Sequence, residues 1–364
     1  MYDYLIVGAG LFGAVFAHEM TKVGKTCHVI DKRNHLGGNC YTKNESGIIV
    51  HKYGAHIFRT DDRDIWSYVN DFAEFNRFTN CPVARYKDEL FNLPFNMNTF
   101  YELWGVKTPD EAKMEIERQR IVIETPKNLE EKVLSLVGTD VYEKLVKGYT
   151  EKQWGMKCTE LPPDIIARIP IRLTFDNNYF NERYQGVPIG GYTPLFEKML
   201  SRSRVDLSSS YDGYYRTKTH AKKIVYCGRV DELYGYEFGR LPHRSLKFEE
   251  KRYEKENVQG NAVVNYTDYD VPYTRSIEHK HFEGTKCSFT IVTKEFPAEY
   301  KGDAYPFYPI KNSRSIALYE QYKKRALNDG IILGGSVAEY EDYTMDETIK
   351  SALNKARKEI RDES

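Results

Sequence analysis

A glycine-rich turn near the N-terminus constrains this chain more than any other feature. Apolar residues 4–7 run directly into the pattern Gly-x-Gly-x-x-Gly, formed by Gly8, Gly10 and Gly13. This combination predicts a strand, a tight turn and a helix over residues 11–22, which is the first βα unit of a Rossmann-like fold. Gly8 permits the turn, Gly10 lets backbone N–H groups approach a pyrophosphate, and Gly13 lets the helix pack closely on the strand.

An acidic residue, Asp31, and a further glycine pair, Gly37–Gly38, follow the first glycine turn. Asp31 ends the next apolar stretch, where a carboxylate can accept from ribose hydroxyls. Residues 31–39 resemble the double-glycine extension of flavoproteins, in which a further turn approaches FAD closely. The sequence contains no other Gly-x-Gly-x-x-Gly, so we expect FAD rather than a separate NAD domain; the alternative is a glycine turn in an ordinary βα unit. The predicted cofactor contacts here are Gly8, Gly10, Leu11, Phe12, Gly13, Asp31, Lys32, Gly38 and Asn39.

Composition narrows the classes of partner. The 364 residues carry 53 basic and 53 acidic side chains, so no global charge favours nucleic acid or an anionic membrane surface. No apolar run is long enough to span a bilayer, and the first strand begins at Tyr2, which leaves no room for a signal peptide. The six cysteines are scattered without metal-ligand spacing. We expect a cytoplasmic protein with reduced thiols and no metal site.

Hydrophobic periodicity predicts a mixed α/β chain with a discontinuous first domain. The FAD-binding domain is expected over residues 1–65, 190–230 and 315–364. A helical domain is expected over 66–170, with a mobile substrate loop near 162–178, and an antiparallel β-sheet domain over 235–314. The helices are expected at 63–75, 97–104, 108–120, 128–137, 139–153 and 345–360, and the strands at 244–248, 261–266, 288–292 and 331–335.

Several motifs combine aromatic and cationic side chains. Trp154 ends the polar run Gly-Tyr-Thr-Glu-Lys-Gln-Trp-Gly, and it is either a stacking surface for a sugar or base, or a packing residue at a helix end. Arg168 and Arg172 lie in a proline-bracketed segment that reads as a loop, and arginines on loops often bind phosphate. His56 follows a glycine turn, where a lone histidine is usually structural. No nucleophile–base order stands out, so the cofactor is expected to supply the chemistry.

Long stretches of the chain resemble one family, the UDP-galactopyranose mutases. They include MYDYLIVGAGLFGAVFA, HKYGAHIF, GYTEKQWG, LTFDNNYF, QGNAVVNYTD and VPYTR. The resemblance implies an FAD-binding Rossmann-like domain with an inserted helical bundle and a small antiparallel sheet. It also implies interconversion of pyranose and furanose nucleotide sugars, with N5 of reduced FAD as the nucleophile at C1. NAD(P)H or another external reductant would reduce the flavin, and family members are commonly homodimers.

The same resemblance implies roles for single residues. Arg168 and Arg275 match two arginines that clamp the diphosphate, and His56 matches a histidine beside the flavin. Gly335 follows an apolar strand, where flavoproteins often return to FAD. The substrate-binding positions implied are Tyr149, Thr150, Trp154, Tyr179, Phe180, Asn265 and Tyr308.

The chain departs from the family pattern near its end and beside His56. Ser336 stands where the family commonly has arginine, and Asp342 where it has a phosphate-binding tyrosine, which Tyr343 replaces by a one-residue shift. Thr344 also replaces an aspartate, and Arg59 replaces a histidine. Arg59 can donate to an N-acetyl carbonyl, or pair with a neighbouring aspartate on the surface.

These departures leave the sugar open. UDP-galactopyranose and UDP-N-acetylgalactopyranose are the first candidates, and a dTDP-6-deoxyhexopyranose is the sibling alternative. Two other classes also stay open, a flavin amine-oxidase-like oxidoreductase and a nucleotide-sugar-binding protein without activity. Turnover of an amine with oxygen would mark the former, and binding without isomerisation the latter.

Overall fold

The computed structural model describes residues 1–168, 171–217, 221–301 and 304–362. The chain divides into two compact units. The first comprises Met1–Asn76, Gly186–Ser245 and Tyr300–Ser364, and the second comprises Arg77–Gln185 and Leu246–Glu299. The second unit therefore contains both the helical and the sheet segments; the three sequence-based domain boundaries stay a prediction.

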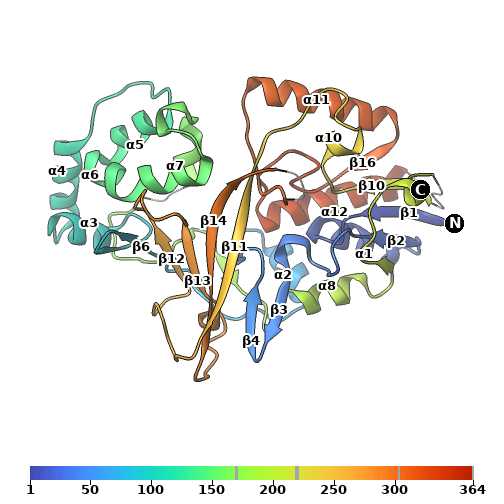
Figure 1. The fold of residues 1–364 in the computed structure, drawn as a ribbon, viewed down its shortest axis with the longest axis horizontal. Helices are drawn as coiled ribbons and strands as arrows, with labels where there is room; N and C mark the ends of the chain where they lie inside the picture. The colour runs from blue at the N-terminus through green and yellow to red at the C-terminus, as the bar shows by residue number, and fades with distance from the viewer. Residues whose placement is uncertain (169–170, 218–220, 302–303, 363–364) are drawn as a thin grey trace. The chain divides into compact units, whose positions relative to one another are not determined.

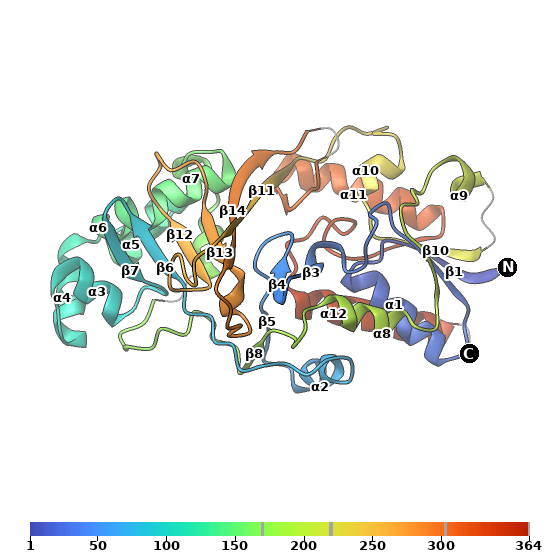
Figure 2. The ribbon, with the colours of Figure 1, turned by 60° about the horizontal axis from the view of Figure 1, so that its bottom comes forward.

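A parallel sheet forms the centre of the first unit (Figure 2). Its strand order is β16 (Ile331–Leu333), β10 (Ala221–Tyr226), β1 (Tyr2–Val7), β2 (Cys27–Ile30) and β9 (Arg204–Asp206). All four pairings are parallel, and β1 lies between β10 and β2. This is the predicted Rossmann-like arrangement, in which the central strand leads into the glycine turn.

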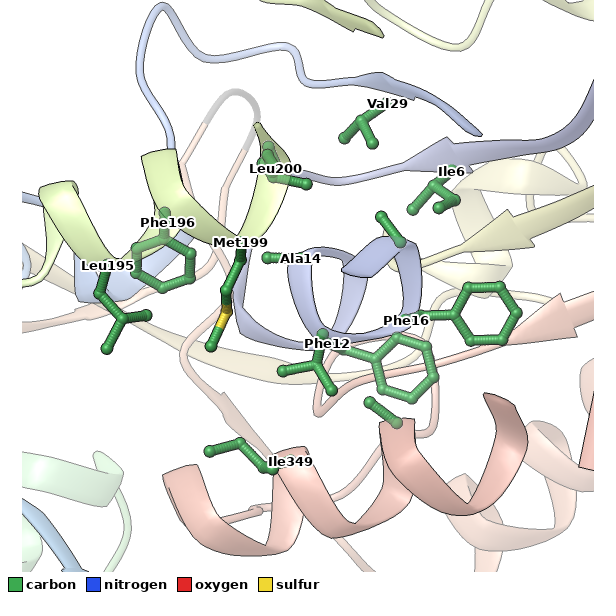
Figure 3. Packing of buried hydrophobic residues seen from close by; sticks show 14 of the residues in the cluster. Ile6, Phe12, Ala14, Phe16, Val29, Leu195, Phe196, Met199, Leu200 and Ile349 are labelled. Carbon is green, nitrogen blue, oxygen red and sulfur yellow. The ribbon is translucent and has the colours of Figure 1, made fainter. Parts of the chain in front are cut away.

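Helices α1 (Leu11–Lys22), α8 (Thr193–Leu200) and α12 (Met345–Asp362) bury their apolar faces in one core with the sheet (Figure 3). Side chains of β1 and β2, such as Ile6 and Val29, lie on one side of α1, and Ile349 of α12 lies on the other. Phe12 and Phe16 stack with ring centroids 6.3 Å apart. The bounds of α1 are as predicted, and α12 begins at the predicted residue.

Shorter elements complete the first unit. They are the 3₁₀ turn Gly38–Cys40, β3 (Thr42–Glu45), β4 (Ile48–His51), β5 (Phe58–Thr60), α2 (Arg63–Asn70), α9 (Gly213–Thr217), α10 (Val230–Leu233), β15 (Tyr308–Pro309) and α11 (Ser313–Asn328). Figure 1 labels most of them along the chain. The helix expected over 63–75 ends at Asn70, because Phe75 forms an antiparallel bridge with Pro188 and Asn76 N–H donates to the Val187 carbonyl (3.0 Å).

A mixed sheet organises the second unit. Its order is β11 (His243–Tyr253), β14 (Thr290–Glu299), β13 (Arg275–Glu278), β12 (Val263–Tyr266), β6 (Val83–Tyr86) and β7 (Glu89–Asn92). The first residues of β11 belong to the first unit, where they pair with β15. The β6–β7 hairpin lies in a segment expected to be helical, and its pairing with β12 is parallel, which adds a parallel pair to the antiparallel sheet that was expected.

The helices of the second unit follow the sequence closely. They are α3 (Met97–Trp104), α4 (Pro109–Gln119), α5 (Leu129–Val137), α6 (Thr139–Val141) and α7 (Gly148–Trp154), with 3₁₀ turns at Cys158–Glu160 and His279–His281. A capping box between Thr108 and Glu111 begins α4. The stretch expected as one helix over 139–153 contains a π-helical turn at Tyr142–Lys147. The segment expected to be a loop contains a 3₁₀ helix, Pro163–Arg168, and β8 (Tyr184–Gly186) follows later.

Candidate functional site

The N-terminus of α1 is shaped to receive an anion. Gly10 is the N-cap, no side chain caps the helix, and no acidic residue lies in its first turn. The first N–H groups of a helix have no partner within the helix, and its dipole favours negative charge there. The turn of Gly8, Gly10, Leu11 and Phe12 is therefore suited to a pyrophosphate, and its contact with the cofactor stays a prediction.

The glycines of this turn are required by space. A Cβ on Gly13 would lie 2.0 Å from the Gly8 carbonyl oxygen, so α1 packs on β1 only with glycine at that position. Gly8 adopts a φ of +121°, which L side chains rarely adopt. The two glycine turns also meet, because a Cβ on Gly38 would lie 3.1 Å from Gly10 Cα. Gly37 N–H donates to the Ala9 carbonyl (2.9 Å) and fixes this meeting.

Asp31 connects the end of β2 to the first glycine turn. Its Oδ2 accepts from Ala9 N–H (2.8 Å) and its Oδ1 from Arg33 N–H (2.8 Å). Each carboxylate oxygen has a second lone pair, so ribose hydroxyls can still donate to it. The adjacent Lys32 is exposed, and Asn39 accepts from the Arg33 guanidinium (2.9 Å).

Sequence reasoning did not single out Arg33, although the structure places it beside Asp31 and Asn39. Its guanidinium carbon lies 3.8 Å from the ring centroid of Tyr305 and 4.4 Å from that of Tyr53. A cation over aromatic faces is attracted by their quadrupoles, so this contact stiffens the second glycine turn. The only sequence signal for Arg33 was the basic pair Lys32–Arg33 directly after Asp31. Its aromatic partners are not near this pair in sequence.

The C-terminal glycine pair packs on the start of α1. A Cβ on Gly334 would lie 2.1 Å from the Phe12 ring, and Gly335 has a φ of +85°. Gly335 N–H donates to Glu339 (3.0 Å), which is in turn paired with Lys355 of α12 (2.5 Å). The structure therefore brings Gly335 to the predicted cofactor turn.

Two predicted positions after the Gly334–Gly335 pair differ in burial. Asp342 is exposed, whereas Tyr343 is half-buried. Burial raises the pKa of Tyr343 to about 12, and the carboxylates of Glu339, Glu341 and Glu347 act in the same direction. Tyr343 is therefore a neutral hydroxyl donor at neutral pH.

The other predicted residues of the first unit are half-buried. His56 Nδ1 lies 2.8 Å from the Gly54 carbonyl, and its backbone N–H donates to His51 Nδ1 (3.2 Å). Arg59 lies in β5, and Tyr308 lies in β15 opposite Arg244. The contact with the Gly54 carbonyl fixes the His56 ring against its own glycine turn.

A row of polar side chains crosses three strands of the second unit. Asn265 on β12 is directly opposite Arg275 on β13, and Arg275 is directly opposite Glu295 on β14. Opposite residues in antiparallel strands share one face of the sheet, so these side chains project together. The Asn265 Oδ1 atom is buried and has no hydrogen-bond partner within the described residues. A donor group on a ligand would satisfy it.

Helix α7 carries another three predicted residues. Thr150 is buried, and Tyr149 and Trp154 are half-buried. Trp154 and Tyr179 both pack against the apolar core of this unit, and the stacking of Trp154 on a sugar or base stays a prediction. A Cβ on Gly148 would lie 2.3 Å from the Thr267 carbonyl oxygen, so the helix begins in close contact with the loop after β12.

The Tyr179–Phe180 pair stands on a hydrogen-bonded loop. The two rings are 5.6 Å apart at 79°. Arg172 donates to the Phe180 carbonyl (3.3 Å), to the Asn178 carbonyl and to the Asn181 side chain, so this arginine holds the loop in place. The side chain of Arg168 lies outside the described residues, and movement of the loop stays a prediction.

Within the described ranges, no three or more His, Cys, Asp or Glu residues lie together in a group suited to a metal ion. Among helices of the described part of the chain, none is long and apolar enough to cross a membrane.

The fold and the glycine geometry define the class as a dinucleotide-binding Rossmann-like protein, and a family model described as an NAD(P)-binding Rossmann-like domain matches residues 6–72. A model described as UDP-galactopyranose mutase matches residues 144–342. A probable UDP-galactopyranose mutase from Klebsiella pneumoniae is 37% identical, with 97% of this chain and 94% of that protein covered. A dTDP-fucopyranose mutase from Escherichia coli is 35% identical, with 98% of each covered.

Solved structures agree on the fold. A crystal structure of reduced UDP-galactopyranose mutase matches with a TM-score of 0.74 at 12% identity, covering 98% of this chain and 93% of that one. A putative protoporphyrinogen oxidase from Exiguobacterium matches with a TM-score of 0.68 at 12% identity, covering 98% of each chain. The chain belongs to the UDP-galactopyranose mutase family, and it is an isomerase of the mutase type. Family membership and the Rossmann-like domain imply a flavin cofactor.

Proposed function

We propose that this protein interconverts the pyranose and furanose forms of a UDP-sugar, UDP-galactopyranose or UDP-N-acetylgalactopyranose, with reduced FAD as its cofactor. The Asn265–Arg275–Glu295 row carries this proposal, because it presents a fixed cation beside an unpaired buried acceptor. A diphosphate needs the cation, and a nucleobase or sugar supplies donors for the acceptor.

The proposed cofactor contacts lie in the first unit. The uncapped start of α1, with Gly10 and Gly38, would hold the pyrophosphate of FAD, and Asp31 would accept from its ribose. His56 and Gly335 would lie toward the flavin. When bound and reduced, FAD supplies a nucleophilic nitrogen, N5, for the anomeric carbon of the sugar.

Most of the proposed substrate contacts lie in the second unit. Arg275, together with Arg168, would hold the diphosphate before and after the C1–oxygen bond breaks. Tyr179 and Phe180 would receive the base. UDP must stay in the site while the sugar ring opens. The two arginines would therefore act in catalysis as well as in substrate binding. Further substrate contacts are proposed for Tyr149, Thr150, Trp154, Asn265, Tyr308 and Tyr343.

The identity of the sugar rests on fewer residues. Arg59, in β5, offers a rigid fork of donors that suits an N-acetyl carbonyl. A dTDP-6-deoxyhexopyranose is the second candidate, since the Escherichia coli relative named dTDP-fucopyranose mutase is 35% identical over almost the whole chain.

A panel of nucleotide sugars tests the proposal directly. Purified protein is reduced with dithionite and incubated with UDP-galactopyranose, UDP-N-acetylgalactopyranose and a dTDP-6-deoxyhexopyranose, and the products are separated by chromatography. A furanose product that forms only with reduced protein supports the proposal. Full activity with oxidised flavin under air would overturn the mechanism.

The proposal extends to the setting of the reaction. An external reductant, such as NAD(P)H, would reduce the flavin, and the protein would act in the cytoplasm as a homodimer. The six free cysteines of the structure agree with a reducing compartment. Light scattering of the purified flavoprotein measures the oligomeric state.

A further inference from the structure

Four backbone carbonyl groups converge on the ammonium group of Lys152. Its Nζ lies 2.8 Å from the Tyr266 oxygen, 2.7 Å from that of Asp268, 2.8 Å from that of Val271 and 3.1 Å from that of Tyr273. An ammonium has three N–H donors, so the four carbonyl oxygens of this loop share them. No side-chain carboxylate is a hydrogen-bond partner among these contacts.

The loop depends on a cation at its centre. Carbonyl dipoles that point at one another repel, and a buried carbonyl without a donor is costly. Rings of backbone carbonyls elsewhere in proteins are stabilised by a bound monovalent cation. Burial lowers the pKa of Lys152 to about 8, so the group remains charged at neutral pH.

The loop joins the two strands that carry the polar row of the site. Tyr266 directly follows Asn265 at the end of β12, and Tyr273 precedes Arg275 at the start of β13. Lys152 itself lies on α7, between Tyr149 and Trp154. One ammonium group therefore ties the helix to the hairpin, and Gly148 permits the close approach at the helix start.

We propose that Lys152 is a positioning residue whose ammonium group occupies a carbonyl cage and so fixes Asn265 and Arg275 relative to Tyr149 and Trp154. The proposal rests on the proposed function, since those four residues are its substrate contacts. Lys152 touches neither substrate nor cofactor in this scheme. It acts on binding of the nucleotide sugar and leaves the flavin in place.

The test uses Lys152→Ala and Lys152→Met in the full flavoprotein. Both remove the charge, but only alanine leaves room for an added cation. We expect each variant to keep its FAD while its Kd for UDP and its KM for the nucleotide sugar rise roughly 10- to 100-fold. Methylammonium or ammonium should restore much of the UDP affinity of Lys152→Ala, whereas tetramethylammonium, which has no N–H donor, should not.

The matched control is Lys147→Ala. Lys147 lies just before the same helix, but its side chain is 40% exposed and pairs with Glu143 (3.0 Å), so its removal should leave the Kd for UDP unchanged. The proposal is overturned if a folded Lys152 variant binds UDP like the wild type, if small amines restore nothing, or if neither variant folds, since Lys152 would then serve stability alone. Wild-type protein that binds no UDP and isomerises no nucleotide sugar would instead refute the proposed function.

Discussion

Arg275 donates to both carboxylate oxygens of Glu295, from Nε (3.0 Å) and from Nη2 (2.9 Å to each oxygen). Glu295 is completely buried, while 24% of the Arg275 side chain is exposed. A bidentate pair of this kind fixes the plane of the guanidinium as well as its position. The sheet thus orients a cation at its surface through an anion in its interior.

This pair predicts that loss of Arg275 affects folding as well as turnover. Arg275→Met leaves the Glu295 carboxylate buried without its partner, so we expect the free energy of unfolding to fall by about 3–5 kcal/mol. Turnover should fall with it, while FAD stays bound. Urea denaturation and the isomerase assay measure the two effects.

The Arg275→Met/Glu295→Gln double variant separates the two effects. It removes the unpaired charge, so most of the lost stability should return without the turnover. A double variant that recovers turnover would show that Arg275 does not bind the diphosphate.

Arg168→Ala tests the other proposed arm of the clamp. Because charge-assisted bonds to phosphate are strong, we expect a loss of roughly 100-fold in kcat/KM. The visible flavin spectrum should be unchanged. Arg118→Ala serves as the control, since Arg118 is exposed on α4 and pairs with Glu115. Near wild-type turnover of Arg168→Ala at low substrate would contradict the assignment.

Substitution of Gly13 tests the packing of α1 on β1. A Cβ at this position would lie 2.0 Å from the Gly8 carbonyl oxygen, so the helix must move. We expect Gly13→Ala to lose about 1–3 kcal/mol of stability and most of its bound flavin. Gly213→Ala is the matched control, because no described atom beyond its chain neighbours and its own helix backbone lies within 4 Å of the added methyl group. Thermal unfolding and flavin content per chain give the comparison; equal flavin content in both variants would refute the expectation.

Arg59→His tests whether Arg59 contacts the sugar. If the guanidinium binds an N-acetyl carbonyl, kcat/KM for UDP-N-acetylgalactopyranose should fall more than that for UDP-galactopyranose. The expected difference is about 1–3 kcal/mol, as for one hydrogen bond to a charged group. Equal losses with both substrates, or none, would mean that Arg59 does not contact the sugar.

His243 predicts a loss of stability in mild acid. Burial lowers its pKa from 6.5 to about 4, and its Nδ1 lies 3.0 Å from the Leu241 carbonyl. Between these two pH values the unfolded chain binds the proton and the folded chain does not, so the free energy of unfolding falls as the pH falls through this window. The contribution reaches about 3 kcal/mol at pH 4.

His243→Asn should remove that contribution and leave the rest of the pH dependence. Urea denaturation of both proteins at several pH values between 4 and 7 measures the difference. Parallel stability curves for the two proteins would show that His243 does not titrate as predicted.

The local parts of the fold were predictable, since their signals lie within a few residues. The glycine turn gave α1 its bounds, and Thr108 with Glu111 marked the start of α4. The π-helical turn at Tyr142–Lys147 was not predictable, because apolar periodicity in a short stretch does not separate its hydrogen bonding from that of an α-helix. The early end of α2 depends on Pro188, which is more than a hundred residues away.

The candidate site was likewise predictable only where its signals are local or come from resemblance. Arg275 and Asn265 came from resemblance, and the structure adds that they are cross-strand neighbours. Arginines on the segment of Arg168 and Arg172 suggested phosphate binding in general, and the structure adds that Arg172 donates to backbone carbonyls of its own loop. The partners of Lys152 lie 114 to 121 residues further along the chain, so no local pattern could have indicated them.

The order of strands in the parallel sheet determines when the support of the first glycine turn is complete. β1 is synthesised well before its neighbour β10, which begins at Ala221, and before the edge strand β16, which begins at Ile331. Helix α12, which packs on α1, ends at Asp362. The pieces of the second unit, Arg77–Gln185 and Leu246–Glu299, are both synthesised before that edge strand. The nascent chain therefore completes this sheet and its helical cover only after residues 331–362 are made, so a chain without them should hold no flavin.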